Sequence, residues 1–315
     1  MLLLDKPLGF SSNQVLQKAK WLLRADKAGH TGTLDPLATG VLPLCFGAAT
    51  KFSQVQLDAD KTYEAVLLLG QKTSTGDAEG DVIETRSVPP ITPELLDKLT
   101  RQFTGVLAQL PPMYSALKKD GRALYEYARA GQEVERATRQ ITVHELHMAL
   151  ANDPRAPAAI RIIVRCSKGT YIRTLGEDIG EAIGCGAHLG FLRRIGTGGY
   201  TVAQCITLPA LEAMTEPERD ACLLPPQSLV ADFPQVTLDA DNAGRFLSGL
   251  RRRAGPEGWG VDASQSQPRV QVFGRDPVAF LGTGHITADE LIPERLLSPI
   301  EIKDMLPTRP LEPPA

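Results

Sequence analysis

Residues 29–40 read Gly-His-Thr-Gly-Thr-Leu-Asp-Pro-Leu-Ala-Thr-Gly, and this segment is the most informative part of the 315-residue chain. Its central residue is Asp35, whose backbone Pro36 pushes toward an extended conformation. Gly29, Gly32 and Gly40 permit positive φ angles and the close approach of a ligand or another backbone. The segment therefore predicts a loop that presents a carboxylate. From these residues alone, an ordinary Asp-Pro turn explains the pattern as well as a catalytic acid does.

Regular elements are predicted on both sides of this loop. Ser11-Ser12, followed by apolar residues at helical spacing, predicts a capped amphipathic helix that ends before residue 27. Residues 1–4 predict a first strand, and the apolar residues 37–47 and 62–70 predict two buried strands. Residues 71–80 are polar and contain glycine, so a loop is predicted there.

Further helices and strands follow along the chain. Thr92 before Pro93 is the preferred start of a helix, with a capping threonine and proline at the first helical position. Residues 141–148 and 158–166 predict a pair of strands around an Asn-Asp-Pro turn, and residues 170–183 predict a helix. In the second strand Ile160, Ile162 and Val164 are predicted to face one way, and the two arginines of this strand to face the other. This mixture of strands and helices predicts an α+β fold.

The composition and the apolar pattern of the sequence change at about residue 231. From there on, short apolar pieces alternate with glycine and proline, and residues 269–273 and 278–282 are predicted strands. A chain of this length accommodates a large domain followed by a small one. We therefore expect a small β-rich unit from residue 231, and a frayed tail at 307–315, which contains four prolines.

Composition excludes several classes of protein. Apolar residues make up 43% and charged residues 23% of the chain, as in an ordinary globular protein, and no apolar run is long enough to span a membrane. Five cysteines without Cys-x-x-Cys spacing predict reduced thiols in a cytoplasmic protein rather than disulfides or a zinc site. His144 and His147 lack the spacing of a zinc-binding His-Glu-x-x-His motif. The sequence implies neither a metal nor a cofactor.

The charge of the chain is distributed unevenly. A net charge of −3 is not typical of a protein that binds polyanions with its whole surface. Residues 111–140 nevertheless carry six Lys or Arg against four acids, and residues 161–195 carry six against three. Residues 251–253 are three consecutive arginines. Contact with RNA is therefore expected through local basic patches.

Four motifs together resemble one known family. Residues 30–43 resemble the signature loop of the pseudouridine synthases, and in particular of the TruB family, the bacterial tRNA pseudouridine-55 synthases. Three further motifs agree in the expected order: Leu3-Leu4-Asp5-Lys6-Pro7 with Ser11-Ser12, Asp60-Lys61-Thr62-Tyr63-Glu64, and Ser167-Lys168-Gly169-Thr170-Tyr171-Ile172-Arg173. Residues 184–194 extend the match, which is close through about residue 205 and loose beyond it. Four ordered motifs are much more specific than one.

The resemblance implies a fold, an activity and a partner. It implies a pseudouridine synthase catalytic domain at residues 1–230, built on a mixed, largely antiparallel sheet flanked by helices, and a PUA-like domain and tail at residues 231–315. The activity is the isomerisation of uridine 55 in the TΨC loop of tRNA, without a cofactor. The expected partner is the tRNA, through its TΨC stem-loop. We expect a cytoplasmic monomer that needs neither a protein partner nor a membrane.

Pseudouridine formation breaks the N1–C1′ bond of uridine and joins C5 to C1′, which requires an anionic group beside the sugar and the base. Asp35 suits this role by analogy with the carboxylates of retaining glycosidases. Burial raises the pKa of such a carboxyl group, and a guanidinium partner offsets that effect. In the resembled family the arginine of Gly-Thr-Tyr-Ile-Arg pairs with the catalytic aspartate, which implies this role for Arg173. Without the resemblance, Arg173 would be interpreted as a helix-surface residue.

The resemblance also assigns residues to the handling of the target base. Tyr63 corresponds to the tyrosine that stacks on this base and helps to remove the C5 proton; taken alone, it would be a half-buried strand residue. An enzyme that acts on a base inside a folded loop must flip it out and fill the vacancy. His30 matches the histidine beside the flipped nucleotide.

Five other positions complete the expected site. Tyr171 and Leu192 match residues that line the uridine pocket, although both also fit a plain core role. Asp77 matches an aspartate near the site. Lys6 and Pro7 match the pair that supports the signature loop.

Residues 111–139, called the thumb below, match an RNA-binding insertion of the family. Tyrosines here alternate with lysines and arginines, so that bases can stack on rings while cations meet phosphates. The residues alone fit an ordinary solvated insertion equally well. Two other functions stay open at this point: an RNA-binding folding factor in which Asp35 is incidental, and a synthase that acts on other RNA. The route taken by Asp35, whether sugar attack, base attack or removal of a ribose proton, is open too.

Overall fold

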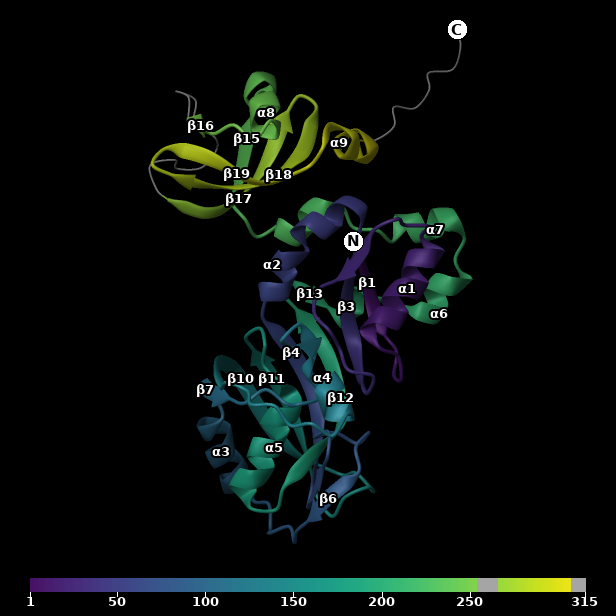
Figure 1. Ribbon diagram of the computed structural model, residues 1–315, viewed down its shortest axis with the longest axis vertical. Coiled ribbons are helices and arrows are strands. Elements are labelled where there is room, and N and C mark those ends of the chain that lie inside the picture. Colours follow the sequence, from purple (N-terminus) through teal and green to yellow (C-terminus); the bar gives the residue numbers. More distant parts are fainter. Residues whose placement is uncertain (254–265, 307–315) are drawn as a thin grey trace.

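The computed structural model describes residues 1–253 and 266–306. A ten-stranded sheet forms the body of the molecule, and a five-stranded sheet forms a smaller unit near the C-terminal end. Figure 1 shows the smaller unit above one end of the body. Among the described residues, no helix is long and apolar enough to cross a membrane.

The large sheet brings together strands that lie far apart in the sequence. In spatial order they are β14 (Ile206–Thr207), β1 (Leu2–Lys6), β3 (Ala38–Phe46), β12 (Ala187–Thr197), β4 (Lys61–Leu69), β11 (Ala159–Cys166), β10 (Arg139–Ala151) and β7 (Gly105–Gln109), with β2 (Ala28–His30) beside β3 and β13 (Tyr200–Thr201) beside β12. Among the described strand pairs of this sheet, only β1–β14 and β3–β12 are parallel. The prediction of a mixed, largely antiparallel sheet flanked by helices is confirmed.

The middle of this sheet is buried, and its close packing depends on glycine. Ile160, Ile162 and Val164 of β11 point into the main hydrophobic core, as their alternation predicted. Gly40 in β3 has a φ of 103°, and a Cβ atom there would lie 2.1 Å from the carbonyl oxygen of Arg194 in β12. Only glycine allows β3 and β12 to approach each other so closely.

The helices of the body begin and end where local sequence signals favour it. They are α1 (Ser12–Leu22), α2 (Ser53–Asp58), α3 (Pro93–Gln102), α4 (Leu124–Arg129), α5 (Ile172–Ile183), α6 (Leu208–Ala213) and α7 (Glu216–Ala221), with 3-10 turns η1 (Gly47–Phe52), η2 (Val202–Gln204) and η3 (Pro226–Val230). Ser11 and Gln14 form a capping box at α1, and Thr92 caps α3. Helix α5 starts two residues later than predicted, because Gly169 has a φ of 79° and Tyr171 an extended backbone.

The prediction that residues 71–80 are a loop is wrong in part. Gln71–Thr73 form β5, which pairs with β6 (Val82–Thr85), and only the turn between these strands is irregular. All four residues of β6 are exposed, so backbone hydrogen bonds hold this hairpin without an apolar face. A pattern of apolar residues therefore could not reveal it.

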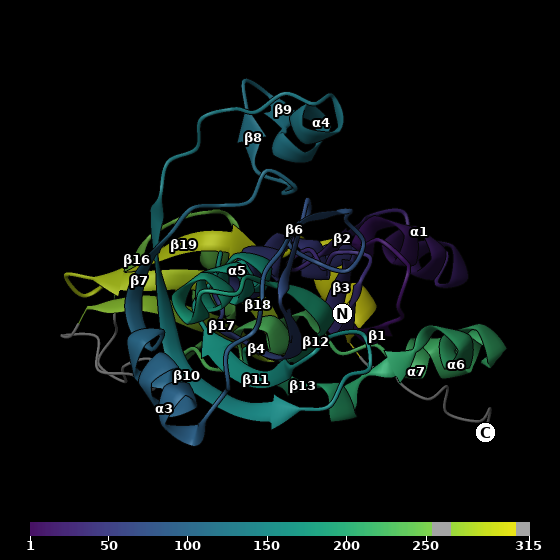
Figure 2. The same ribbon diagram turned by 90° about the horizontal axis from the view of Figure 1, so that it is seen from below.

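The thumb projects from the body between β7 and β10, as Figure 2 shows. It contains a short hairpin of β8 (Lys118–Lys119) and β9 (Arg122–Ala123), followed by α4. The guanidinium of Arg122 lies 4.6 Å from the centre of the Tyr127 ring, and that of Arg129 lies 5.3 Å from the Tyr125 ring. Cations and rings therefore alternate on the folded thumb as they do in the sequence.

The five-stranded unit has its own core. Its strands are β15 (Gln235–Leu238), β17 (Gln267–Arg275), β18 (Val278–Thr287), β19 (Glu290–Leu296) and β16 (Arg252–Arg253), and it includes α8 (Ala240–Leu247) and α9 (Pro299–Met305). The predicted β-rich character is confirmed, whereas the predicted tail at 307–315 lies outside the described residues. Two arginines of the 251–253 run, Arg251 and Arg253, form ion pairs with Glu290, so part of this expected basic patch is neutralised.

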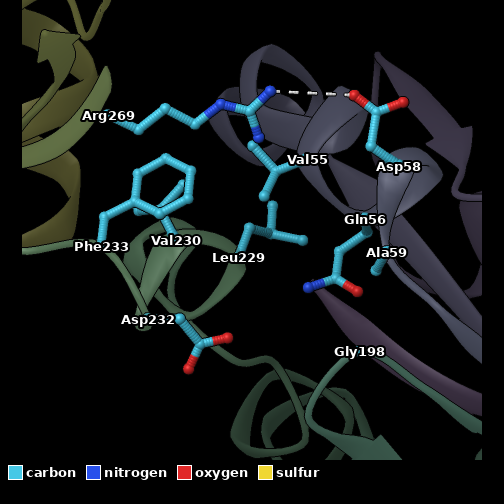
Figure 3. Close-up of a pocket in the computed structure, with 10 residues that line it drawn as sticks. All are labelled: Val55, Gln56, Asp58, Ala59, Gly198, Leu229, Val230, Asp232, Phe233 and Arg269. Atoms are coloured by element: carbon cyan, nitrogen blue, oxygen red, sulfur yellow. Dashed lines mark ion pairs between the residues drawn. The ribbon is translucent and has the colours of Figure 1, made fainter. Parts of the chain in front are cut away.

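The two units meet across a shared apolar layer. The Phe52 ring of the body lies 5.2 Å from the Phe280 ring of the smaller unit, and Lys51 forms an ion pair with Glu301 at 2.6 Å. Figure 3 shows a pocket of about 200 Å³ beside this layer, with Arg269 reaching across it toward Asp58. The interface gives the smaller unit a defined position on the body.

Candidate active site

The signature loop lies between β2 and β3, and side chains from α1 and β1 fix it. Leu34 donates its backbone N–H to the hydroxyl of Ser12 at 2.8 Å, and this hydroxyl donates to the Leu34 carbonyl at 3.1 Å. The buried ammonium of Lys6 donates to the carbonyl oxygens of Pro7 and Phe10. It also lies 3.4 Å from the carbonyl oxygen of Pro36. These contacts hold Asp35 in an irregular segment that cannot move freely.

Asp35 and Arg173 lie together in the structure. Helix α5 presents Arg173 from the side opposite the loop, and its guanidinium lies 3.0 Å from the Asp35 carboxylate. The arginine side chain is only 5% exposed, whereas that of Asp35 is 40% exposed. The acid is therefore paired on one side and accessible to a ligand on the other.

Arg173 also joins two further segments to the loop. It donates to the carbonyl oxygen of Thr75 at 2.9 Å and to that of Tyr114 at 2.5 Å, and it lies 3.7 Å from the Asp77 carboxylate. Asp77 is fixed in turn by the Thr75 hydroxyl at 2.6 Å. One guanidinium thus connects the signature loop, the β5–β6 turn and the base of the thumb.

The charges around Asp35 act on its protonation in opposite directions. Burial is the largest effect and raises the pKa of the Asp35 carboxyl above its usual value. The cationic Arg173 lowers this pKa, the like charge of Asp77 raises it, and Lys6 lowers it. The net direction is upward, so the carboxylate is more basic than an ordinary aspartate.

Tyr63 lies under the loop on β4 and is buried. Burial raises the pKa of its phenol, and the nearby guanidinium of Arg194 opposes that rise. Arg194 is 1% exposed and donates to the carbonyl oxygen of Val41 at 2.7 Å, and it lies 3.3 Å from that of Gly32. It forms no ion pair among the residues that the structure describes.

The remaining predicted residues surround the same centre to different degrees. His30, at the end of β2, is half-buried, and burial lowers its pKa, which favours a neutral imidazole. Leu192 of β12 is buried and pairs in register with Ala38, next to the loop. Tyr171 precedes α5, and its backbone is fixed by the side chain of Gln109, with hydrogen bonds of 2.8 and 3.0 Å.

Sequence reasoning missed three contributors to the site. Arg194 and Lys61 lie within the family-like motifs, but nothing in those motifs indicates what either side chain contacts. The Lys61 ammonium is buried and donates to three carbonyl oxygens, those of Gln56, Leu57 and Ala59. Gln109 lies outside these motifs. The sequence therefore offered a reason to consider Arg194 and Lys61 but none to consider Gln109.

Comparisons with known proteins identify the family of this chain. A family model described as "TruB family pseudouridylate synthase (N terminal domain)" matches residues 20–172. The "tRNA pseudouridylate synthase B C-terminal domain" model matches residues 173–231, and "Pseudouridine synthase II TruB, C-terminal" matches residues 234–297. The chain belongs to the TruB family of pseudouridine synthases.

Relatives in this family are similar over nearly the whole chain. The tRNA pseudouridine synthase B of Verminephrobacter eiseniae (strain EF01-2) is 62% identical over 312 residues, which cover 98% of this chain and 92% of the relative. That of Cupriavidus pinatubonensis (strain JMP 134 / LMG 1197) is 54% identical over 302 residues, covering 94% and 93%. The resemblance inferred from the four motifs is thereby confirmed.

A solved structure shares the fold at lower identity. The chain matches one in the crystal structure of a Cbf5-Nop10-Gar1 complex with a TM-score of 0.69 and 23% identity, covering 96% of this chain and 85% of the other. This likeness supports the α+β architecture of a TruB family member.

Proposed function

We propose that this protein is a tRNA pseudouridine synthase that converts uridine 55 of the TΨC loop to pseudouridine. The observation that carries the proposal is the 3.0 Å contact between Arg173 and the accessible carboxylate of Asp35 on the signature loop. Membership in the TruB family and relatives named tRNA pseudouridine synthase B support it.

Asp35 supplies the anionic group that the reaction needs. Its carboxylate acts while the N1–C1′ bond breaks, and Arg173 keeps it ionised in a site from which RNA excludes water. Asp77 and the carbonyl of Thr75 hold the guanidinium from behind, so that Arg173 cannot turn away from Asp35. The pair is preorganised before the substrate binds.

The other predicted residues handle the base. The target uridine flips out of its loop, and His30 occupies the vacated position. Tyr63 stacks on the flipped base and assists the loss of the C5 proton, while Leu192 and Tyr171 form walls of the pocket. Lys6 and Pro7 support the loop through their contacts with its backbone.

Each of the two sheets forms the core of one unit with its own role. Residues 1–230 form the catalytic unit, with the thumb at 111–139 closing on the tRNA, and residues 231–315 form a PUA-like unit. The Tyr114 carbonyl places the start of the thumb within hydrogen-bonding distance of Arg173, which supports a thumb position near the substrate. The enzyme acts as a cytoplasmic monomer and needs no protein partner.

Asp35→Asn tests the proposal, because it keeps the shape of the side chain and removes its charge. We expect the rate of pseudouridine formation in a TΨC stem-loop to fall by at least about 10³-fold, with RNA affinity nearly unchanged. The measurement is release of tritium from C5-labelled uridine, alongside a binding titration. Asp97→Asn on the exposed side of α3 is the matched control.

Two alternatives make different predictions. A tRNA-folding factor without essential catalysis would keep its function in Asp35→Asn, and retained isomerisation by that variant would refute the enzymatic role given to Asp35. A synthase for other RNA would leave uridine 55 unmodified. Mapping pseudouridine in tRNA from cells that lack the gene decides this second point.

A further inference from the structure

Trp21 is the most exposed aromatic ring of the body. It lies on the outer face of α1 and is 76% exposed, whereas the apolar residues on the other face of this helix are buried. An exposed ring of this size marks a contact site more often than a smaller apolar side chain does, because tryptophan is enriched at binding hot spots. The ring borders a hollow of about 520 Å³, called the α1 hollow below. Its lining residues are Gln17, Lys20, Trp21, Leu22, Arg24, Ala25 and Arg219.

The charge of the α1 hollow has one sign. Three cations and no carboxylate line it. Arg24 is partly neutralised by Glu216 at 2.8 Å, but Lys20 forms no ion pair with any described residue. Arg219 donates to the carbonyl oxygens of Leu211 at 3.0 Å and Leu22 at 3.3 Å, which fixes its guanidinium without a carboxylate. A positive, partly rigid hollow beside an aromatic ring is suited to an anionic ligand with flat groups.

Helix α1 connects this hollow to the active site. At its N-terminal end Ser12 is hydrogen-bonded to Leu34, the residue before the catalytic acid. Trp21 is nine positions after Ser12, so it lies about 14 Å farther along the helix axis than the residue that contacts the signature loop. Figure 2 shows α1 beside β2, toward the side of the body on which the thumb projects. A tRNA with its target uridine at Asp35 is long enough to reach the α1 hollow.

We propose that the α1 hollow is a second tRNA contact, remote from the target uridine. A base or ribose packs on the ring of Trp21, and the adjoining phosphates lie near Lys20 and Arg24. The inference rests on the proposed function, because that function makes tRNA the substrate. RNA is favoured over a protein ligand because the hollow lacks any acid and combines cations with a ring, which serves phosphates and bases together.

The first test is the affinity for a full-length tRNA transcript, measured in the Asp35→Asn background so that no turnover occurs. Trp21→Ala is expected to raise the Kd about tenfold, the effect of losing one stacked base, and Trp21→Phe to restore most of the affinity. Val278→Ala, at a 74% exposed position in the five-stranded unit, is the matched control and should leave the Kd unchanged. Circular dichroism and a thermal melt establish that the variants are folded.

The second test uses the ring as its own reporter. Trp259→Phe leaves Trp21 as the single tryptophan of the chain, and binding of tRNA should then quench its fluorescence. Lys20→Gln should lower the slope of log Kd against log salt concentration by about one, as expected for one lost phosphate contact.

The outcomes separate this inference from the proposed function. If Trp21→Ala binds tRNA as tightly as its parent and tRNA leaves Trp21 fluorescence unchanged, the α1 hollow is not a tRNA site and a protein ligand becomes the better explanation. If the chain with Asp35 intact forms no pseudouridine in tRNA, the proposed function fails whatever Trp21 does. A tenfold loss of affinity in the Asp35→Asn background, together with an unchanged kcat at saturating tRNA for Trp21→Ala with Asp35 intact, supports both.

Discussion

On the two sides of the signature loop, buried cations have different partners. On one side Arg173 faces two carboxylates, those of Asp35 and Asp77, at 3.0 and 3.7 Å. On the other side Arg194, Lys6 and Lys61 are all buried, and their hydrogen bonds go to backbone carbonyl oxygens. The first side sets the ionisation of Asp35, and the second fixes the course of the backbone.

The two sides therefore differ in what their charged side chains do: Asp35 stays available to a substrate, whereas the buried cations hold the backbone in place. A carboxylate opposite a guanidinium gains charge-assisted hydrogen bonds and stays available to a substrate. A buried cation bound to carbonyls has no such freedom, because each carbonyl would be left unsatisfied if the cation moved. We therefore expect substitutions on the acidic side to reduce turnover as well as stability, and those on the cationic side to reduce mainly stability.

Among the changes that compare the two sides, Arg173→Lys should have the largest effect. Lysine keeps the charge, but its single ammonium cannot contact Asp35 and the carbonyls of Thr75 and Tyr114 at once. We expect kcat to fall by about 10²-fold, and a carbonyl left without its donor to lower the free energy of unfolding by about 1–3 kcal/mol. Single-turnover rates and urea titrations measure the two quantities.

The same change at Arg194 should cost a similar amount of stability but much less turnover. Arg194→Lys leaves at least one of the Val41 and Gly32 carbonyls without a donor, which costs about 1–3 kcal/mol of unfolding free energy. We expect kcat of the folded fraction to fall less than about tenfold. The division between the two sides is wrong if this variant loses more kcat than Arg173→Lys while it remains equally stable.

A smaller effect concerns the acid limb of the pH profile. If catalysis needs the ionised carboxylate, kcat/KM falls as pH drops through the raised pKa of Asp35. Asp77→Asn removes a charge that raises this pKa, so the limb should move to lower pH. Lys6→Met removes a charge that lowers it, so the limb should move to higher pH. Shifts in the same direction for both variants would contradict this account of the field around Asp35.

The smallest effect lies at alkaline pH, on the cationic side. Burial lowers the pKa of Lys61 from 10.5 to about 8. Between these values the unfolded chain binds more protons than the folded one, so Lys61 makes the free energy of unfolding rise with pH. The free energy of unfolding of the native chain minus that of Lys61→Met should therefore increase from pH 8 to pH 10. Urea titrations at both values measure it in a Cys166→Ala background, because Lys61 lowers the pKa of the Cys166 thiol. The titration of the Cys45 thiol, with a pKa of about 11, cancels in the difference. A constant difference would show that Lys61 stays protonated.

Much of the fold was predictable because local rules decided it. The capping residues at Ser11 and Thr92 mark helix starts that any surrounding structure would respect. Alternation in residues 158–166 gave the correct buried face of β11. The β5–β6 hairpin was not predictable, because exposed strands held by backbone bonds carry no apolar pattern.

The site was predictable only where a motif carried it. Asp35, Tyr63 and Arg173 each belong to a sequence motif that resembles the family. The support from Lys61, Arg194 and Gln109 depends on which carbonyls and amides lie within reach after folding. Backbone carbonyls are present at every residue, so a sequence cannot tell which of them a cation will meet.

The sequence by itself determined the identity of the proposed catalytic acid, the order of the motifs and the residues that start the helices, because these depend on neighbours along the chain. The tertiary structure alone decided that Arg173 faces Asp35 across 138 positions, that Asp77 lies behind it, and that Trp21 borders a positive hollow. The reason is physical: charge interactions depend on distance and burial, and both are set only when distant segments pack together.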